Sequence, residues 1–238
     1  MKKDGFTLIE CLLGLALSLF VISAGLEFFV RAEKAFLRLK EREEAGQSAL
    51  AALDRMRIDL LHAGRGLSPE IGLGLVEAAE ATPDDLRTAA LEKELALAAD
   101  VRAGDTRLSL LSTEDITAGQ RLALRQDEAG EVRTIVRADA GGVVVDAPVE
   151  RDYLRGAASL ALIERVTYFL DGSARILRRR VNTSPAQPLL EGAARAVWSL
   201  EAEAHLVRIR LELDIEGAHP HEATVFLKNP ALARNSGT

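Results

Sequence analysis

The sequence predicts an α+β fold in which a long N-terminal helix, half transmembrane and half amphipathic, packs on an antiparallel β-sheet domain. Residues 6–30 form an apolar run, and a helix needs about 20 such residues to cross a bilayer core. Residues 31–64 repeat apolar side chains at spacings of three and four, which is the period of an amphipathic helix. From residue 106 onward, short β-rich runs alternate with turns. Together these patterns give the order of a helix followed by a sheet.

The apolar run contains a carboxylate close to its beginning. Glu10 is the one strongly ionisable residue between Phe6 and Leu26. A charge inside such a segment is costly, so its presence is by default a functional hypothesis. If the chain were cut between Gly5 and Phe6, a new α-ammonium would appear one helical turn from Glu10. The two opposite charges would then neutralise each other, within one subunit or between neighbours.

These residues resemble the N-terminus of the type IV prepilin family. The matching sequence is Lys2-Lys3-Asp4-Gly5, then Phe6-Thr7-Leu8-Ile9-Glu10, then the apolar run. The resemblance implies that residues 1–5 are a leader, that a prepilin peptidase cuts after Gly5, and that the same enzyme N-methylates Phe6. It also implies that residues 6–30 remain on the protein as a transmembrane helix and that Glu10 guides filament assembly. Because basic residues before such a run favour the cytoplasm, we expect a single-pass inner-membrane protein with a periplasmic C-terminal domain.

A second, looser resemblance narrows the type of pilin. Residues 53–64, and the pattern of residues 168–215, look like the minor pilins of the PilW type and the secretion pseudopilins of the J type. This resemblance implies a minor subunit in the priming or tip complex of a type IV pilus or a type II secretion pseudopilus. The implied partners are other major and minor pilins, the prepilin peptidase and methyltransferase, and the inner-membrane assembly platform.

The remaining chain divides into a globular domain, residues 65–228, and a tail, residues 229–238. Gly64, Gly66 and Pro69 are expected to end the long helix near Ala63. A short strand is predicted at 72–77. A second helix is predicted from Thr82, because Thr-Pro-Asp-Asp is typical of a capped helix start, and it would reach about Ala99, although 94–101 could also form a strand. The span 83–158 is interpreted as a variable insertion, and the further strands are predicted at 106–112, 120–126, 131–138, 143–147, 159–170, 174–180, 207–216 and 223–228.

Composition limits the classes of function. The formal net charge is −6 and aromatic residues make up 4% of the chain, so general nucleic-acid binding is not expected. Cys11 is the single cysteine, which rules out an intramolecular disulfide; many major pilins carry one, and this sequence departs from them there. Stability must therefore come from packing.

The search for chemistry yields few candidates. His219 and His221 lack further metal ligands in the sequence pattern, and the acidic pairs Asp84-Asp85 and Asp127-Glu128 lack a calcium-loop pattern. The one basic run is Arg175, Arg178, Arg179 and Arg180, which is interpreted as a charged strand face, with DNA or another anionic surface as the alternative. We therefore expect no catalytic residues, no metal and no cofactor, and not an enzyme.

Three other interpretations remain open at this point. The apolar run could be a secretory signal peptide cut near Ser23-Ala24-Gly25. It could be a plain membrane anchor with Glu10 near the interface. In either case the globular part could be a periplasmic enzyme or binding domain held by its signal or anchor.

Overall fold

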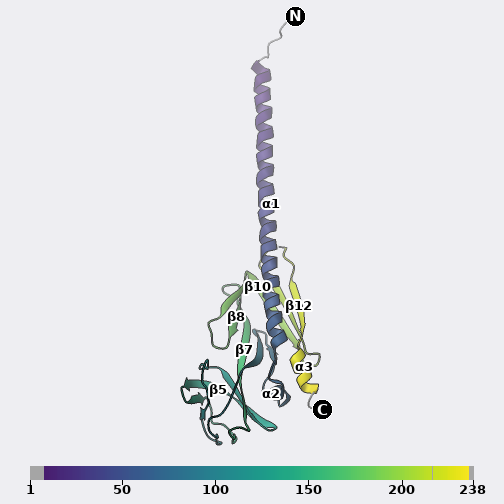
Figure 1. Ribbon diagram of the computed structural model, residues 1–238. Helices are drawn as coiled ribbons and strands as arrows, with labels where there is room; N and C mark the ends of the chain where they lie inside the picture. The colour runs from purple at the N-terminus through teal and green to yellow at the C-terminus, as the bar shows by residue number, and fades with distance from the viewer. Residues whose placement is uncertain (1–7, 216, 236–238) are drawn as a thin grey trace. The chain divides into compact units, whose positions relative to one another are not determined.

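The computed structural model describes residues 8–215 and 217–235 of the chain (Figure 1). The chain divides into two compact units, Met1–Gln47 and Ser48–Thr238. The structure confirms an α+β architecture with a long N-terminal helix and antiparallel sheets. The predicted leader, including Gly5, and the predicted modification site at Phe6 lie outside the described residues.

Helix α1 spans Leu8–His62, 55 residues without interruption. It is long and apolar enough to cross a membrane, and none of its most apolar stretch is buried inside the protein. In the globular unit, the helix ends as predicted, because Gly64 and Gly66 both adopt the left-handed conformation at φ +75° and +74°. At Gly66 a side chain is also excluded by space, since an added Cβ would lie 2.7 Å from the Cβ of Leu91.

The two elements after α1 differ from the sequence prediction. The predicted strand at 72–77 is wrong, since Gly72 ends a short helix, α2, at Ser68–Gly72. Pro69 lies in the first turn of α2, where proline is tolerated because its missing N–H has no helical partner. The first strand, β1, follows at Ala79–Ala81.

The helix predicted from Thr82 to Ala99 is also wrong, because strand β2 occupies Asp85–Leu95. The Thr82 hydroxyl accepts a hydrogen bond from the Asp85 N–H at 3.0 Å and donates one to the Asp85 carboxylate at 2.8 Å. Threonine and aspartate make such local bonds in tight turns as well as at helix starts. Pairing of β2 with a long central strand along most of its length then outweighs the helical preference of its alanines and leucines.

All the paired strands that the structure describes run antiparallel, in two sheets. The larger sheet has nine strands, ordered β1-β2-β7-β4-β5-β6-β3, with β8 bonded to β7 and β9 bonded to β8; the smaller has the order β10-β11-β12. The remaining strand bounds are β3 Arg107–Ser109, β4 Arg121–Gln126, β5 Ala129–Asp139, β6 Gly142–Val145, β7 Ser159–Asp171, β8 Ile176–Val181, β9 Gln187–Glu191, β10 Ala193–Glu201, β11 Leu206–Leu213 and β12 His221–Phe226. The strands predicted from residue 106 onward are confirmed, with ends that shift by a few residues.

Strand β7 is the centre of the larger sheet. Along one edge it pairs with β2, from Leu95 opposite Leu160 to Asp85 opposite Phe169. Along the other edge it pairs first with β4, over residues 159–163, and then with β8, over residues 166–171. The partner on this edge therefore changes at residues 164–165. The span 83–158 supplies β2 to β6, and two of these strands, β2 and β4, border β7 directly.

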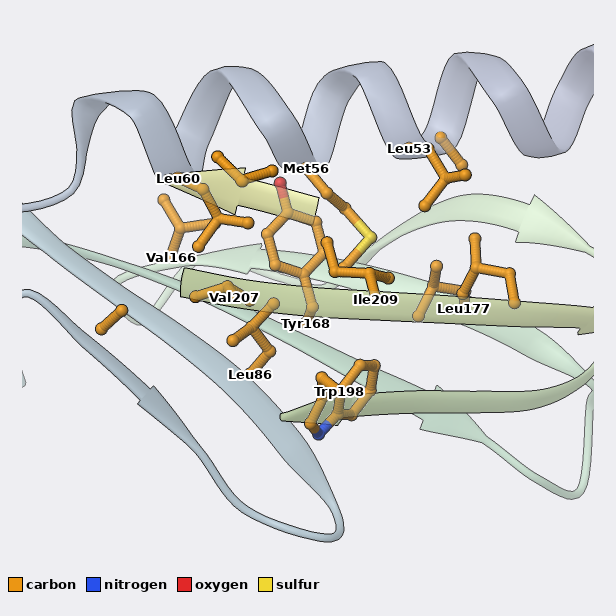
Figure 2. Packing of buried hydrophobic residues seen from close by; sticks show 14 of the residues in the cluster. Leu53, Met56, Leu60, Leu86, Val166, Tyr168, Leu177, Trp198, Val207 and Ile209 are labelled. Atoms are coloured by element: carbon orange, nitrogen blue, oxygen red, sulfur yellow. The ribbon is translucent and has the colours of Figure 1, made fainter. Parts of the chain in front are cut away.

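The main hydrophobic core lies between the end of α1 and the two sheets (Figure 2). Leu53, Met56 and Leu60 point from the helix toward the strands and are buried, as predicted. The amphipathic half was predicted over residues 31–64, but the buried part of α1 starts at Ala49, and the apolar residues Phe36, Leu39 and Leu50 are exposed. A second core, which has no residue from α1, fills the space among β3 to β7 and the loops beside them.

The C-terminal segment is not the loose tail that was predicted. Residues Lys228–Asn235 form helix α3, and Leu227 and Ala233 are buried. The side-chain amide of Asn229 donates to the carbonyl oxygens of Leu61 and Ala63 at 3.3 and 2.9 Å. These carbonyls lie at the end of α1, where helical partners run out, so α3 helps to terminate α1.

Candidate functional site

The N-terminal part of α1 is the strongest candidate for function that the sequence predicted. Glu10 lies in the first turn of the helix, and the next charged residue is Glu27. Between them the large apolar side chains are exposed on every side of the helix, for example Leu13, Leu19 and Phe20. A helix that is apolar all round requires apolar surroundings, in a core or in a membrane.

The polar groups in this stretch fit such surroundings. The Ser18 hydroxyl donates to the carbonyl oxygen of Gly14, one turn back, at 2.7 Å. Polar groups within a bilayer must find partners inside the protein, and this bond supplies one. Beyond the stretch, the exposed face carries ion pairs at i, i+4 spacing, Glu27 with Arg31 and Lys40 with Glu44. The apolar surface is therefore bounded by Glu10 on one side and Glu27 on the other.

Within the globular unit, a buried polar cluster joins α1 to the sheet. Asp59 of α1 accepts a hydrogen bond from the hydroxyl of Tyr168 on β7, and the Nε of Arg179 on β8 donates to the same carboxylate at 2.7 Å. Arg55 lies 3.4 Å from the other carboxylate oxygen. Burial, reinforced by the hydrogen bond to Asp59, raises the pKa of Tyr168, so its hydroxyl stays protonated and remains a donor. Because a shift of the helix by one residue would move Asp59 away from Tyr168 and Arg179, these two bonds specify one position of α1 on the sheet.

The basic run predicted on residues 175–180 is largely neutralised. Arg175 pairs with Asp214, Arg178 with Asp171 at 3.1 Å, and Arg179 with Asp59 at 2.7 Å. Arg180 lies over the ring of Phe169, with 5.5 Å between the guanidinium carbon and the ring centre. Three of these four arginines thus serve the fold, and they do not form a continuous cationic surface.

The other candidates are also placed by the structure. Asp85 is held by Arg87 and Thr82, and Asp127 has φ +55° in the turn between β4 and β5. His221 begins β12, opposite Leu211. In the part of the chain that is described, residues 8–215 and 217–235, no group of three or more His, Cys, Asp or Glu side chains could hold a metal ion.

One cluster was not foreseen. Arg87, Arg121 and Arg165 come from three different strands and meet Arg180 around one cavity. They are far apart in sequence, so no charge run marks them. The one indication in the sequence was an arginine at the first position of a strand, followed by apolar residues, as in Arg121-Leu122-Ala123-Leu124.

Comparison with known proteins places the chain in no family. No family model and no curated protein match the sequence. Among solved structures, the Gp54 tailspike of the Acinetobacter baumannii bacteriophage AP22, in complex with a capsular saccharide of that bacterium, matches with a TM-score of 0.28 and 12% sequence identity. The match covers 32% of this chain and 15% of the tailspike chain, and it carries no argument about fold or function.

Proposed function

We propose that this protein is a minor pilin or pseudopilin, cleaved after Gly5, N-methylated at Phe6 and assembled into a type IV pilus or a type II secretion pseudopilus. In this proposal the globular domain lies in the periplasm before assembly, and the protein belongs to the priming or tip complex. Its partners are the other pilins, the prepilin peptidase and the inner-membrane assembly platform. It has no catalytic role of its own and no cofactor.

The observation that carries the proposal is the change of character along α1. The helix exposes apolar side chains on all sides up to Val30, whereas residues 49–60 bury one stripe against the sheet. A secretory signal peptide is removed after the apolar run, so it does not need to form one helix with the folded domain. A filament subunit needs such a helix, because the helix connects its filament-forming half to its domain. The charge pattern of residues 1–10 adds the family-specific support.

Intact-mass analysis of the protein purified from membranes tests the proposal. A pilin-type product lacks residues 1–5 and carries one added methyl group on Phe6. Retention of all residues would indicate a plain anchor, and a product that begins near residue 25 would indicate a cleaved signal peptide. Either of these masses contradicts the proposal.

A variant of the cut site supplies the control. Gly5 has no side chain, which lets a peptidase approach the backbone closely. Gly5→Leu should therefore accumulate as an uncut membrane protein with an unmethylated N-terminus. If Gly5→Leu is processed as the wild type is, the assigned cut site is wrong.

A further inference from the structure

A cavity of about 580 Å³ opens on one face of the larger sheet, at the point where the neighbour of β7 changes from β4 to β8. Side chains alternate between the two faces of a strand. Leu86 and Tyr168 lie in the core beneath α1, so Arg87, Arg165 and Thr167 lie on the opposite face. Directly paired residues share a face, and the pairing of Thr167 with both Arg87 and Arg180 brings these two arginines to that face as well.

The walls of the cavity are fixed by hydrogen bonds where the sheet divides. Asn182, just after β8, donates its N–H to the carbonyl of Arg165 at 2.7 Å, and its side-chain oxygen accepts the N–H of Arg165 at 2.8 Å. The Thr183 hydroxyl donates to the carbonyl of Ala118 across the opening at 3.3 Å. Glu92 accepts hydrogen bonds from both Gln120 and Asn182. These bonds hold the loops before β4 and after β8 in place, so the cavity is preformed.

The charge of the lining is unbalanced. Arg87, Arg121, Arg165 and Arg180 line the cavity, and no carboxylate lines it. Asp85 and Glu80 form ion pairs with Arg87, although neither of them lines the cavity. Within residues 8–215 and 217–235, by contrast, no carboxylate forms an ion pair with Arg121, Arg165 or Arg180. Four guanidinium groups therefore line the cavity, in a chain whose net charge is −6, and the nearby carboxylates Asp85, Glu80, Glu77 and Glu92 lie outside its lining.

This excess of positive charge opposes folding. Burial, together with repulsion from Arg87 and Arg121, lowers the pKa of Arg165. None of these arginines is directly opposite another, but like charges gathered on one face of neighbouring strands still repel one another. Glu80, opposite Arg87 on β1, offsets part of this charge, but the positions directly opposite Arg121 and Arg165 carry isoleucine, threonine and alanine. The cluster is thus a site where an external anion would supply the missing counter-charge.

The rest of the lining defines the kind of anion. Thr167, Thr183 and Ser184 contribute hydroxyl groups, and no aromatic ring lines the cavity for a base to stack on. Planar guanidinium groups bind phosphate and carboxylate through paired hydrogen bonds. The volume lies within the usual range for small-molecule sites, about 300–1,000 Å³, and exceeds what one inorganic ion would fill.

We propose that this cavity binds a small, hydroxyl-bearing dianion through Arg87, Arg121, Arg165 and Arg180, with a phosphate monoester or a dicarboxylate as the charged group. This site is independent of the proposed pilin function, because it lies on the sheet face away from α1 and involves neither Glu10 nor the N-terminus.

Binding can be measured on the full chain in detergent by isothermal titration and by thermal melting. The probes are ribose phosphate, tartrate and inorganic phosphate, with ribose and with sodium chloride of equal ionic strength as controls. Saturable binding and a raised melting temperature with ribose phosphate or tartrate, and neither with ribose or chloride, are expected. The tighter binding of ribose phosphate or of tartrate identifies the charged group as phosphate or dicarboxylate, respectively. No saturable binding by any probe, or an equal effect of chloride, would overturn the proposal.

Two variants of the cavity and one control complete the test. Arg165→Gln and Arg121→Gln should each weaken binding by about tenfold or more, since a hydrogen bond to a charged group is lost. The control is Arg208→Gln, an exposed arginine of β11 paired with Glu201, which should bind as the wild type does. Without probe, Arg165→Gln should melt at the same or a higher temperature than the wild type, because repulsion is removed; a merely structural arginine would give a lower value. If Arg165→Gln does not fold, Arg121→Gln decides the question, and unchanged binding by Arg121→Gln would contradict the assignment.

Discussion

Two regions of helix α1 use the same kinds of residue in opposite ways. Residues 8–30 expose their leucines and phenylalanines on every side, whereas residues 49–60 bury one stripe and expose a mixed face of charged and apolar side chains. Leu19 is 55% exposed and Leu60 is 0% exposed, although both are leucines of one continuous helix. The folded domain therefore buries the apolar stripe of the second region by itself, whereas the first region requires apolar surroundings from outside the domain.

The carboxylates of the two regions differ in the same way. Asp59 receives hydrogen bonds from Tyr168 and Arg179 within its own chain. In the proposed function, Glu10 pairs with the α-ammonium of Phe6, which exists only after cleavage at Gly5. One carboxylate then fixes the helix within the domain, and the other fixes it among subunits. The predictions below measure each of these roles, in order of their expected effect on the stability of the domain.

Asp59→Ala should have the largest effect on the domain. It leaves the partly buried Arg179 without its carboxylate and removes the acceptor of Tyr168. Breaking a buried ion pair by removing one partner costs about 3–5 kcal/mol. Chemical unfolding of the full chain in detergent would measure this loss. Asp54→Ala, an exposed aspartate on the same helix, is the matched control, and equal losses for the two variants would contradict the anchoring role of Asp59.

Leu60→Ala should cost about 2–5 kcal/mol, because it opens a cavity in the core between helix and sheets. The matched control is Leu50→Ala, since Leu50 lies in the same helix and is 56% exposed. Its loss should stay within about 0.5 kcal/mol. The two melting temperatures test the comparison directly, and an unchanged value for Leu60→Ala would reject the packing of α1 on the sheet.

The elements that could be predicted are those with a long or strictly alternating pattern. The helix over residues 8–62 and the alternation of Val207, Ile209 and Leu211 with charged residues each contain many consistent positions. The segment 82–99 failed because its local signals fit both a helix and a strand, and the pairing of β2 with β7, some 70 residues away, decided between them. The C-terminal helix α3 failed because its order depends on docking to the end of α1.

The candidate sites show the same division between local and long-range information. Glu10 could be singled out because a short contiguous motif surrounds it. The arginine cavity could not, since Arg87, Arg121 and Arg165 meet only through the order of strands β2, β7 and β4. The run at residues 175–180 shows the opposite error, because its local density of positive charge suggested a cationic patch that the fold does not form. Its partners Asp59 and Asp214 come from distant segments and neutralise it.

Both tyrosines of the chain should make stability fall at alkaline pH. Tyr168 donates to Asp59 and Tyr153 donates to Glu131, the latter at 2.9 Å. Burial, and next the bond to the carboxylate, raises the pKa of both hydroxyls above the usual value of about 10. The folded chain thus keeps its protons to a higher pH than the unfolded chain, so this contribution is complete below about pH 10 and is lost as the pH rises beyond it.

Tyr168→Phe should cost about 1.5–3 kcal/mol at neutral pH, the usual value of a hydrogen bond to a charged group. It should also make the decline in stability above about pH 10 less steep, because one titrating hydroxyl is gone. Unfolding curves at neutral and alkaline pH would measure both effects. An equally steep alkaline decline in the variant would show that Tyr168 does not contribute to it.

Glu10→Ala should have the smallest effect on the domain and a complete effect on assembly. Glu10 lies in the N-terminal unit and belongs to none of the clusters of buried apolar residues, so the unfolding free energy of the domain should stay within about 0.5 kcal/mol of the wild-type value. Membrane insertion should persist, since a charged side chain within a transmembrane segment is costly and alanine removes that cost. Cleavage should also persist, because the leader and Gly5 are unchanged.

What the variant should lose is the axial register between subunits. In low dielectric, a misplaced subunit leaves both the carboxylate and the Phe6 ammonium of its neighbour unpaired, which strongly disfavours the wrong position. Without Glu10, that discrimination disappears. The variant should therefore accumulate in the membrane as a cleaved, methylated protein that does not co-purify with other pilins, whereas Glu27→Ala, at the opposite boundary of the apolar surface, should co-purify normally. Normal co-purification of Glu10→Ala would show that this carboxylate has no part in assembly, while leaving the packing of residues 49–60 on the sheet as it is.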